Sequence, residues 1–186
     1  MKRIAAVMCF VLLLMGCSGA DLELDRAMAL REKMLAAAGC SFDAVVTADY
    51  GNLSYTFSMQ CSSDDRGNLR FSVVKPETIS GISGNVSATG GKLTFDDKVL
   101  AFDLMADGLV TPVSAPWVLI KTLRSGYLTS CGQEGAYLRL SIDDSYADDA
   151  LHLDIWLGEG DIPVRGEIFW KGRRLLSIQV ENFTFL

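Results

Sequence analysis

Apolar and polar residues alternate with a period of two in one segment after another of this chain of 186 residues. A clear example is Leu69–Val73, in which the first, third and fifth residues are apolar and the other two are polar. This period predicts β-strands with one buried face, because successive side chains of a strand point to opposite sides of the sheet. The polar residues between them indicate an antiparallel sheet with one side exposed to water.

Two breaks interrupt the sheet that is expected between Leu69 and Asp96. Lys75-Pro76 ends the first strand, since proline has no N–H to donate and holds the residue before it in an extended conformation. Gly90-Gly91 predicts the turn of a hairpin, after which Leu93 and Phe95 begin the next strand. We therefore expect strand, proline corner, strand, glycine turn and strand in this order.

A helix is expected before the strands, over Leu22–Ala38, with Asp21 as its N-cap and Gly39 after its end. Its polar face carries both signs of charge, which favours packing on the sheet over binding to a membrane surface. A short helix from Ser114 to Leu123 is apolar on most sides, which predicts that it is buried or covers an apolar cavity. The remaining strands are expected at Phe42–Tyr50, Leu53–Cys61, Leu100–Leu104, Leu128–Cys131, Tyr137–Ile142, Leu151–Leu157, Val164–Lys171 and Leu175–Phe185.

Residues 1–16 predict a lipoprotein signal peptide. Two basic residues precede an apolar run from Ile4 to Met15, which is too short to span a membrane. The run leads into Leu14-Met15-Gly16-Cys17, which resembles the lipobox of bacterial lipoprotein precursors. The resemblance implies cleavage before Cys17, diacylglycerol on its thiol, and a lipid anchor on the extracytoplasmic face of the cell membrane. Residues 17–21 would form a short tether; an ordinary secretory signal with an incidental cysteine is the alternative.

Residues 22–186 are expected to form a single domain, and their charge excludes one class of partner. The chain has 17 Lys and Arg against 23 Asp and Glu, and loss of Lys2 and Arg3 with the signal makes the excess of negative charge larger. An acidic protein of this kind is not expected to bind nucleic acid or to be held on anionic lipid by its charge. The membrane contact is therefore expected to come from the lipid.

Few residues suggest catalysis or metal binding, and no cofactor or metal is predicted. Cys40, Cys61 and Cys131 match no zinc spacing, and their odd number leaves the disulfide pairing open. The one histidine, His152, shares a strand face with Asp154, a pairing that in a hydrolase would orient a base for a serine. That face is expected to be exposed to water, which favours a surface histidine. The acidic run from Asp143 to Asp149 is expected to be a hairpin tip, since it lacks the glycine and spacing of known calcium loops.

The order of these segments resembles the LolA/LolB-like superfamily of outer-membrane lipoprotein carriers and receptors. The resemblance rests on the basic-proline strand end at Lys75 and Pro76, the hairpin with the sequence GGKLTFDD, and the Thr111-Pro112 segment with its apolar helix. It implies an α+β, mainly antiparallel β fold: an unclosed half-barrel of about eleven strands with helices on its concave side. The carriers typically have arginine where this chain has Lys75, and lysine lacks the bidentate guanidinium. The predicted anchor differs too, because an anchored protein cannot shuttle between membranes.

The function that this resemblance implies is binding of an acyl chain or another hydrophobic ligand in the half-barrel cavity, without enzymatic activity. The residues expected to line the cavity are Phe42, Val46, Tyr55, Phe57, Phe71, Val73, Leu93, Phe95, Phe102, Trp117 and Ile120. The alternative for these residues is that they form only the core and that the helices fill the concave side.

A second function from the sequence is a non-enzymatic envelope lipoprotein that binds a protein partner, for example as an accessory to a wall hydrolase or a spore-germination factor. Trp156 and Phe169 suggest it, because both are expected on the exposed face and aromatic residues are enriched at interfaces. A hydrolase built around His152 is the weakest of the three hypotheses.

Overall fold

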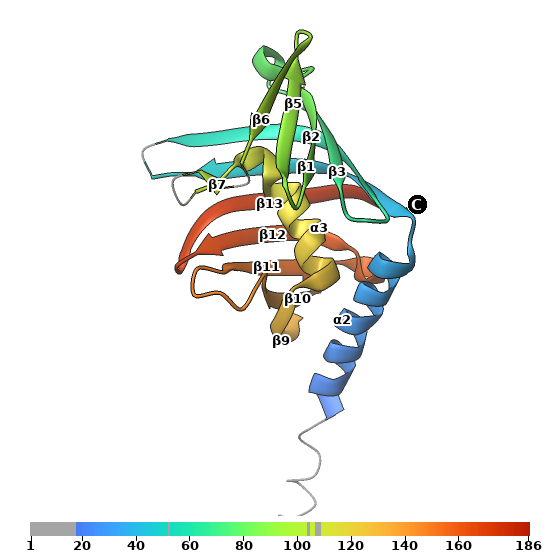
Figure 1. Cartoon of the computed structure of the whole chain (residues 1–186). Helices are drawn as coiled ribbons and strands as arrows, with labels where there is room; N and C mark the ends of the chain where they lie inside the picture. Colours follow the sequence, from blue (N-terminus) through green and yellow to red (C-terminus); the bar gives the residue numbers. More distant parts are fainter. Residues whose placement is uncertain (1–17, 52, 104, 107–108) are drawn as a thin grey trace, which may run out of the picture.

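One antiparallel sheet of eleven strands forms most of the molecule and curves without closing into a barrel (Figure 1). The computed structural model describes residues 18–51, 53–103, 105–106 and 109–186. The strand order is β6-β5-β4-β3-β2-β1-β13-β12-β11-β10-β9, so β6 and β9 are the two edges. The unclosed, mainly antiparallel fold expected from the sequence is confirmed.

The strands follow the alternating segments closely. Their bounds are β1 (Gly39–Asp49), β2 (Ser54–Asp64), β3 (Leu69–Lys75), β4 (Ser83–Ser87), β5 (Gly90–Phe95), β6 (Lys98–Phe102), β9 (Tyr127–Glu134), β10 (Tyr137–Asp143), β11 (Leu151–Leu157), β12 (Pro163–Trp170) and β13 (Arg173–Phe185). A separate pair, β7 (Met105–Ala106) and β8 (Leu109–Val110), precedes the short mid-chain helix. The long strands β1, β2 and β13 lie at the centre of the sheet, where one face is buried.

Two helices lie on one side of this sheet. Helix α2 (Ser18–Ala36) begins four residues earlier and ends two residues earlier than expected. Helix α3 (Ala115–Ser125) follows Ser114 as expected, with Pro116 in its first turn, where the missing N–H removes no helical hydrogen bond. The described residues also form three short 3-10 turns: η1 (Glu77–Ile79), η2 (Pro112–Ser114) and η3 (Glu159–Asp161). None of the described helices is long and apolar enough to cross a membrane.

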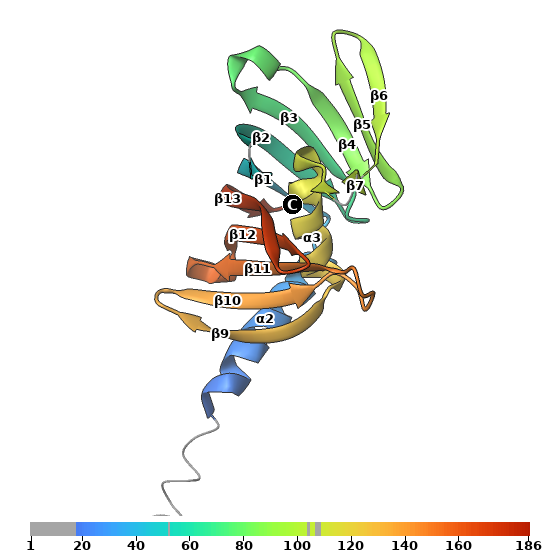
Figure 2. The same cartoon turned by 90° about the vertical axis from the view of Figure 1, so that its left-hand side faces the viewer.

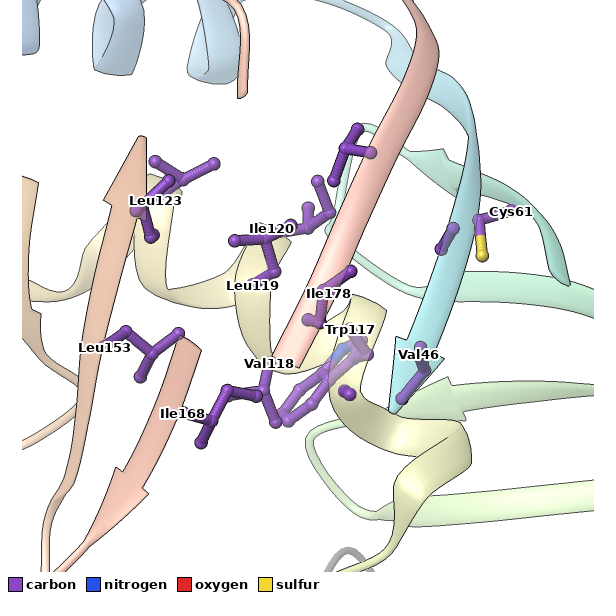
Figure 3. Packing of buried hydrophobic residues seen from close by; sticks show 14 of the residues in the cluster. Val46, Cys61, Trp117, Val118, Leu119, Ile120, Leu123, Leu153, Ile168 and Ile178 are labelled. Carbon is purple, nitrogen blue, oxygen red and sulfur yellow. The ribbon is translucent and has the colours of Figure 1, made fainter. Parts of the chain in front are cut away.

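The central strands bury every second side chain on the side that faces the helices. In β1, Phe42, Ala44, Val46 and Ala48 are buried, and the residues between them are partly exposed. Helix α3 packs against this concave face with nearly all of its side chains, as the sequence predicted for a helix that is apolar on most sides. Figure 3 shows its Trp117, Val118 and Ile120 among strand residues such as Val46, Ile168 and Ile178.

The hairpin between β4 and β5 is present, but its turn is not at Gly90-Gly91. The turn is Ala88-Thr89, and both glycines belong to β5. Gly91 pairs with Phe102 of β6, and a Cβ on Gly91 would lie 2.1 Å from the Phe102 ring. The prediction of a turn at these two glycines is therefore wrong. Gly91 lies within β5, where the absence of a side chain leaves room for the Phe102 ring.

The signal peptide and Cys17 lie outside the described residues. The predicted cleavage and lipidation therefore stay predictions. Helix α2 starts at Ser18, directly after that cysteine, and is followed by the first strand of the sheet (Figure 2).

Gly84 and Gly132 provide a test of how tightly the sheet is packed. A Cβ on Gly84 would lie 2.2 Å from the Lys92 carbonyl oxygen and 2.9 Å from the Phe71 ring, whereas a Cβ on Gly132 would have no atom within 4 Å. We expect Gly84→Ala to lower the free energy of unfolding by about 1–3 kcal/mol, because the backbone has to shift. Gly132→Ala is the control and is expected to be neutral or slightly stabilising. Urea denaturation measures both, and equal effects would contradict this packing.

Candidate functional site

The structure divides the expected cavity residues into three groups by exposure. Phe42, Val46, Phe57, Phe71, Val73, Trp117 and Ile120 are buried, Leu93 and Phe102 are half-buried, and Tyr55 and Phe95 are exposed. The strand register places the residues of the sheet on one face, because directly opposed residues of paired strands project to the same side. What differs among them is how far other side chains cover them.

The middle of the concave face is filled by α3. Trp117 and Ile120 come from this helix and are buried in the same core as Phe42, Val46 and Phe57. Figure 3 shows these helix side chains pointing toward the strands, so this part of the face is packed by the protein's own residues. A ligand that used it would have to displace α3.

Exposure rises along a single row of paired residues toward the β6 edge. Phe71, deep in the sheet, is 3% exposed; Leu93, two strands further along the row, is half-buried; and Leu100 at the edge is 62% exposed. The apolar face therefore continues onto β5 and β6, but the side chains that bury it further along do not extend over these two strands. The row, from edge to centre, is Leu100, Leu93, Gly84, Phe71, Cys61 and Phe42.

We call the uncovered part the open apolar face; it consists of Leu93, Phe95, Leu100 and Phe102 on β5 and β6. Phe95 is 49% exposed at the hairpin end, and Phe102 lies over Gly91 at the other end. Figure 2 shows β5 and β6 set apart from α3, which packs on β10 and β13. Leu100 was missing from the residues expected from the sequence. The same alternation that marked Phe102 would have found it.

Two arginines fasten α2 and α3 to each other. Arg31 of α2 donates to the Leu123 carbonyl at 3.0 Å and to the Gly126 carbonyl at 2.8 Å, both at the C-terminal end of α3. Arg124 of α3 donates to the Met34 carbonyl near the end of α2 and to the Asp65 carbonyl. Each cation thus meets carbonyls at the C-terminal end of the other helix, where helical hydrogen bonding leaves them free. This pairing holds α3 on the concave face.

Lys75 and Pro76 are exposed at the point where the chain leaves β3. The proline corner predicted from the sequence is confirmed, since η1 follows and β4 begins only at Ser83. The functional part of this motif, which the family resemblance implied, stays a prediction.

The histidine of the outer face lies between two carboxylates. His152 Nδ1 is 2.7 Å from Asp143 Oδ1, and its Nε2 is 3.5 Å from Asp154 Oδ1. Ser141 Oγ donates to Asp154 at 2.7 Å instead of to the histidine. A histidine that activates a serine accepts a hydrogen bond from its hydroxyl, and Ser141 does not make this contact with His152.

The outer face around this histidine is less exposed than expected. Asp154 is 5% and Trp156 is 7% exposed, so the expectation that both face water is wrong. The guanidinium carbons of Arg139 and Arg165 lie 5.6 Å and 4.5 Å from the centre of the Trp156 ring and cover it. Guanidinium groups stack on aromatic faces, and the alternation of the sequence alone does not reveal such a contact. Phe169, the second aromatic of this face, is half-buried.

The three cysteines of the described chain are free thiols. Cys40 and Cys61 are buried on the concave face, and burial raises the pKa of both thiols. They are small core residues, as expected, and in this state they are poor nucleophiles. Cys131 is half-buried on β9, and burial raises the pKa of its thiol as well. Within the described residues, no group of His, Cys, Asp and Glu is arranged to hold a metal ion.

Comparison with known proteins finds distant likeness in structure only. A domain assigned to outer-membrane lipoprotein sorting from Vibrio parahaemolyticus has 12% identity and a TM-score of 0.49, covering 90% of this chain and 93% of that chain. A LolA superfamily protein from Nitrosomonas europaea has 8% identity and a TM-score of 0.45, covering 86% and 93%. The lipoprotein LppX from Mycobacterium tuberculosis has 10% identity and a TM-score of 0.42, covering 87% and 93%.

The LolA-like family predicted from the sequence is thus represented among the similar structures. No family model matches the sequence, and no curated protein matches it.

Arg31 tests the attachment of the helices. We expect Arg31→Met to lower the free energy of unfolding by about 1.5–3 kcal/mol, since two carbonyls lose a charged donor. Arg70, an exposed arginine on β3, provides the control, and Arg70→Met is expected to change stability by less than about 0.5 kcal/mol. Both are measured by urea denaturation. Similar values for the two variants would show that Arg31 does not fasten α3.

Asp154 gives a pH dependence with a defined sign. Burial opposes its charge, but hydrogen bonds from Arg139 and Ser141 outweigh this, and the pKa of Asp154 is lowered. The stability it contributes is therefore complete above the unfolded pKa of about 3.9 and is lost as the pH falls through the lower folded pKa. We expect the stability difference between the wild type and Asp154→Asn to shrink as the pH falls below about pH 4, where the Asp154 carboxylate becomes protonated. Asp148→Asn, in the exposed hairpin tip, is the control. A difference that stays constant or grows below about pH 4 would contradict the assignment.

Proposed function

We propose that this protein is a non-enzymatic bacterial envelope lipoprotein, anchored by lipid on Cys17, that binds an acyl chain on its open apolar face. The observation that carries the proposal is the exposure of Phe95 and Leu100 on the same face of the sheet that α3 covers further along. Large apolar side chains that continue a core surface into solvent are typical of a binding surface. The residues beside them, Leu93 and Phe102, are half-buried and form its floor.

The chemistry of this face fits a hydrocarbon chain. Its side chains are apolar, and the one charged residue that shares the face on β6 is Lys98, opposite Phe95 at the hairpin end. Each CH₂ group that leaves water contributes about 0.8 kcal/mol, so a few covered methylenes are enough for measurable affinity. Lys98 would lie near one end of the bound hydrocarbon chain, where its ammonium group would pair with the carboxylate or phosphate of the ligand's head group.

The arrangement of the molecule favours a ligand that another molecule presents. The start of α2, next to the proposed anchor, and the β5–β6 hairpin lie at opposite ends of the protein (Figure 1). The anchor's own acyl chains would be embedded in the membrane at one end. The open apolar face would be held away from that membrane, in a position to receive lipid from elsewhere in the envelope.

Leu100 and Val99 provide a matched pair for testing this function. They are neighbours on β6, 62% and 67% exposed, but they lie on opposite faces of the sheet. We expect Leu100→Asp to weaken binding of a fluorescent C16 fatty acid at least tenfold, because tenfold is about 1.4 kcal/mol, the contribution of about two buried CH₂ groups. Val99→Asp is expected to bind the probe like the wild type.

Titration of the probe into each purified protein measures the three affinities. Wild-type protein that does not bind the probe would contradict the proposal, and so would equal losses in the two variants.

A further inference from the structure

The two edges of the sheet differ sharply in composition. β9 carries serine, threonine, glycine, glutamine and glutamate along Tyr127–Glu134, whereas β6 reads Lys-Val-Leu-Ala-Phe. Proteins usually prevent pairing at an exposed edge with charges, proline or bulges. β6 has one charge, at its first residue, and no proline, and its register with β5 is regular. Val99 and Leu100 are the two most exposed large apolar residues of the sheet strands, and they extend from the two faces of this edge.

The turn before β6 determines which backbone groups face outward. Asp96 and Asp97 form a two-residue turn with φ of 49° and 61°, and Phe95 pairs with Lys98 across it. In such a hairpin the closing pair is hydrogen-bonded, and every second pair after it is too. The backbone N–H and C=O groups of Lys98, Leu100 and Phe102 therefore bond to β5. Those of Val99 and Ala101 point away from the sheet, where the described chain places no further strand.

We propose that β6 is an interaction surface for β6 of a second copy of this chain, paired antiparallel about a two-fold axis at Leu100. In this register Val99 of each copy lies opposite Ala101 of the other, and both have outward-pointing backbone groups. The pairing gives four backbone hydrogen bonds, and it matches all five residues of the strand. Leu100 then lies opposite Leu100 of the second copy as a non-hydrogen-bonded pair, in which the side chains approach most closely.

The register favours a second copy over an unrelated strand. Val99 and Ala101, whose backbone groups point outward, lie on either side of Leu100, so each Val99 meets the Ala101 of the other copy. Opposed residues project to the same side, so the concave faces of both copies lie on one side of the joined sheet. The two open apolar faces become continuous across Leu100, and each copy covers the most exposed part of the other's edge. A two-fold pairing of this kind is closed, because each copy has a single β6, and it leaves the polar β9 edge free. The pairing does not require that an acyl chain is bound.

Cysteine cross-linking of the full chain in bacterial envelopes tests the register. All variants carry Cys131→Ser, since that thiol is only half-buried. A non-hydrogen-bonded antiparallel pair has its Cα atoms about 4.5 Å apart, within the range of a disulfide. With a thiol oxidant, Leu100→Cys is therefore expected to give a disulfide-linked species of twice the monomer mass, which a reductant removes.

Two variants control the cross-link. Val99→Cys is equally exposed but does not face itself across the axis, and it is expected to give at least tenfold less dimer. Val99→Pro combined with Leu100→Cys removes an outward-pointing N–H that β5 does not use, and it is expected to lower the cross-link by a similar factor.

Three results would overturn the proposal: no dimer from Leu100→Cys, equal dimer from Leu100→Cys and Val99→Cys, or a cross-link from Leu100→Cys to a protein of another mass. An undiminished cross-link in the Val99→Pro background would also overturn strand pairing. Binding of the fatty-acid probe is measured separately, so failure of the pairing and failure of the proposed function are distinguishable.

Discussion

The packing of α3 on the concave face is the contact on which the rest of this structure depends. An open sheet with one apolar face is stable only when another layer covers that face. α3 does this with Trp117, Leu119 and Ile120 and five further buried residues. The helix is itself held by arginines, Arg31 from α2 and its own Arg124, which join the C-terminal ends of the two helices. The sheet, the helix and the linkage between the helices thus stabilise one another.

The same contact explains why part of the face is left open. Eleven strands spaced about 4.8 Å apart extend over about 48 Å of sheet. α3 has 11 residues and a length of about 16 Å, and α2 lies toward the β9 end (Figure 2). A single short helix cannot cover the whole width, and the face is left open at the end formed by β5 and β6. The open apolar face is therefore a consequence of how long α3 is and where it is attached, and both the acyl-chain site and the β6 edge follow from it.

Much of this fold could be predicted from the sequence, because a period of two is a local signal. Strands such as β11 and β13 were placed to within two residues of their bounds, and the burial of α3 followed from its apolar sides. The errors arose where contacts between residues far apart in the sequence determine the local structure. The hairpin glycines were placed in a turn because Phe102, which needs the space over Gly91, is eleven residues away in the chain. Trp156 was expected to be exposed, since only the fold brings Arg139 and Arg165 over its ring. The site could be predicted as a list of apolar residues on one face, but not its division into a covered and an open part. That division depends on where α3 packs.

The central claim is that an acyl chain binds beside α3, on β5 and β6, without displacing the helix. NMR of protein with labelled methyl groups, titrated with a saturated long-chain fatty acid, tests it most directly. An acyl chain bound there is expected to shift the Leu93 and Leu100 methyl signals and to leave the Val99 signals and those of the core residues Ile120 and Ile168 unchanged. Unchanged Leu93 and Leu100 signals, or shifts centred on Ile120 and Ile168, would contradict it.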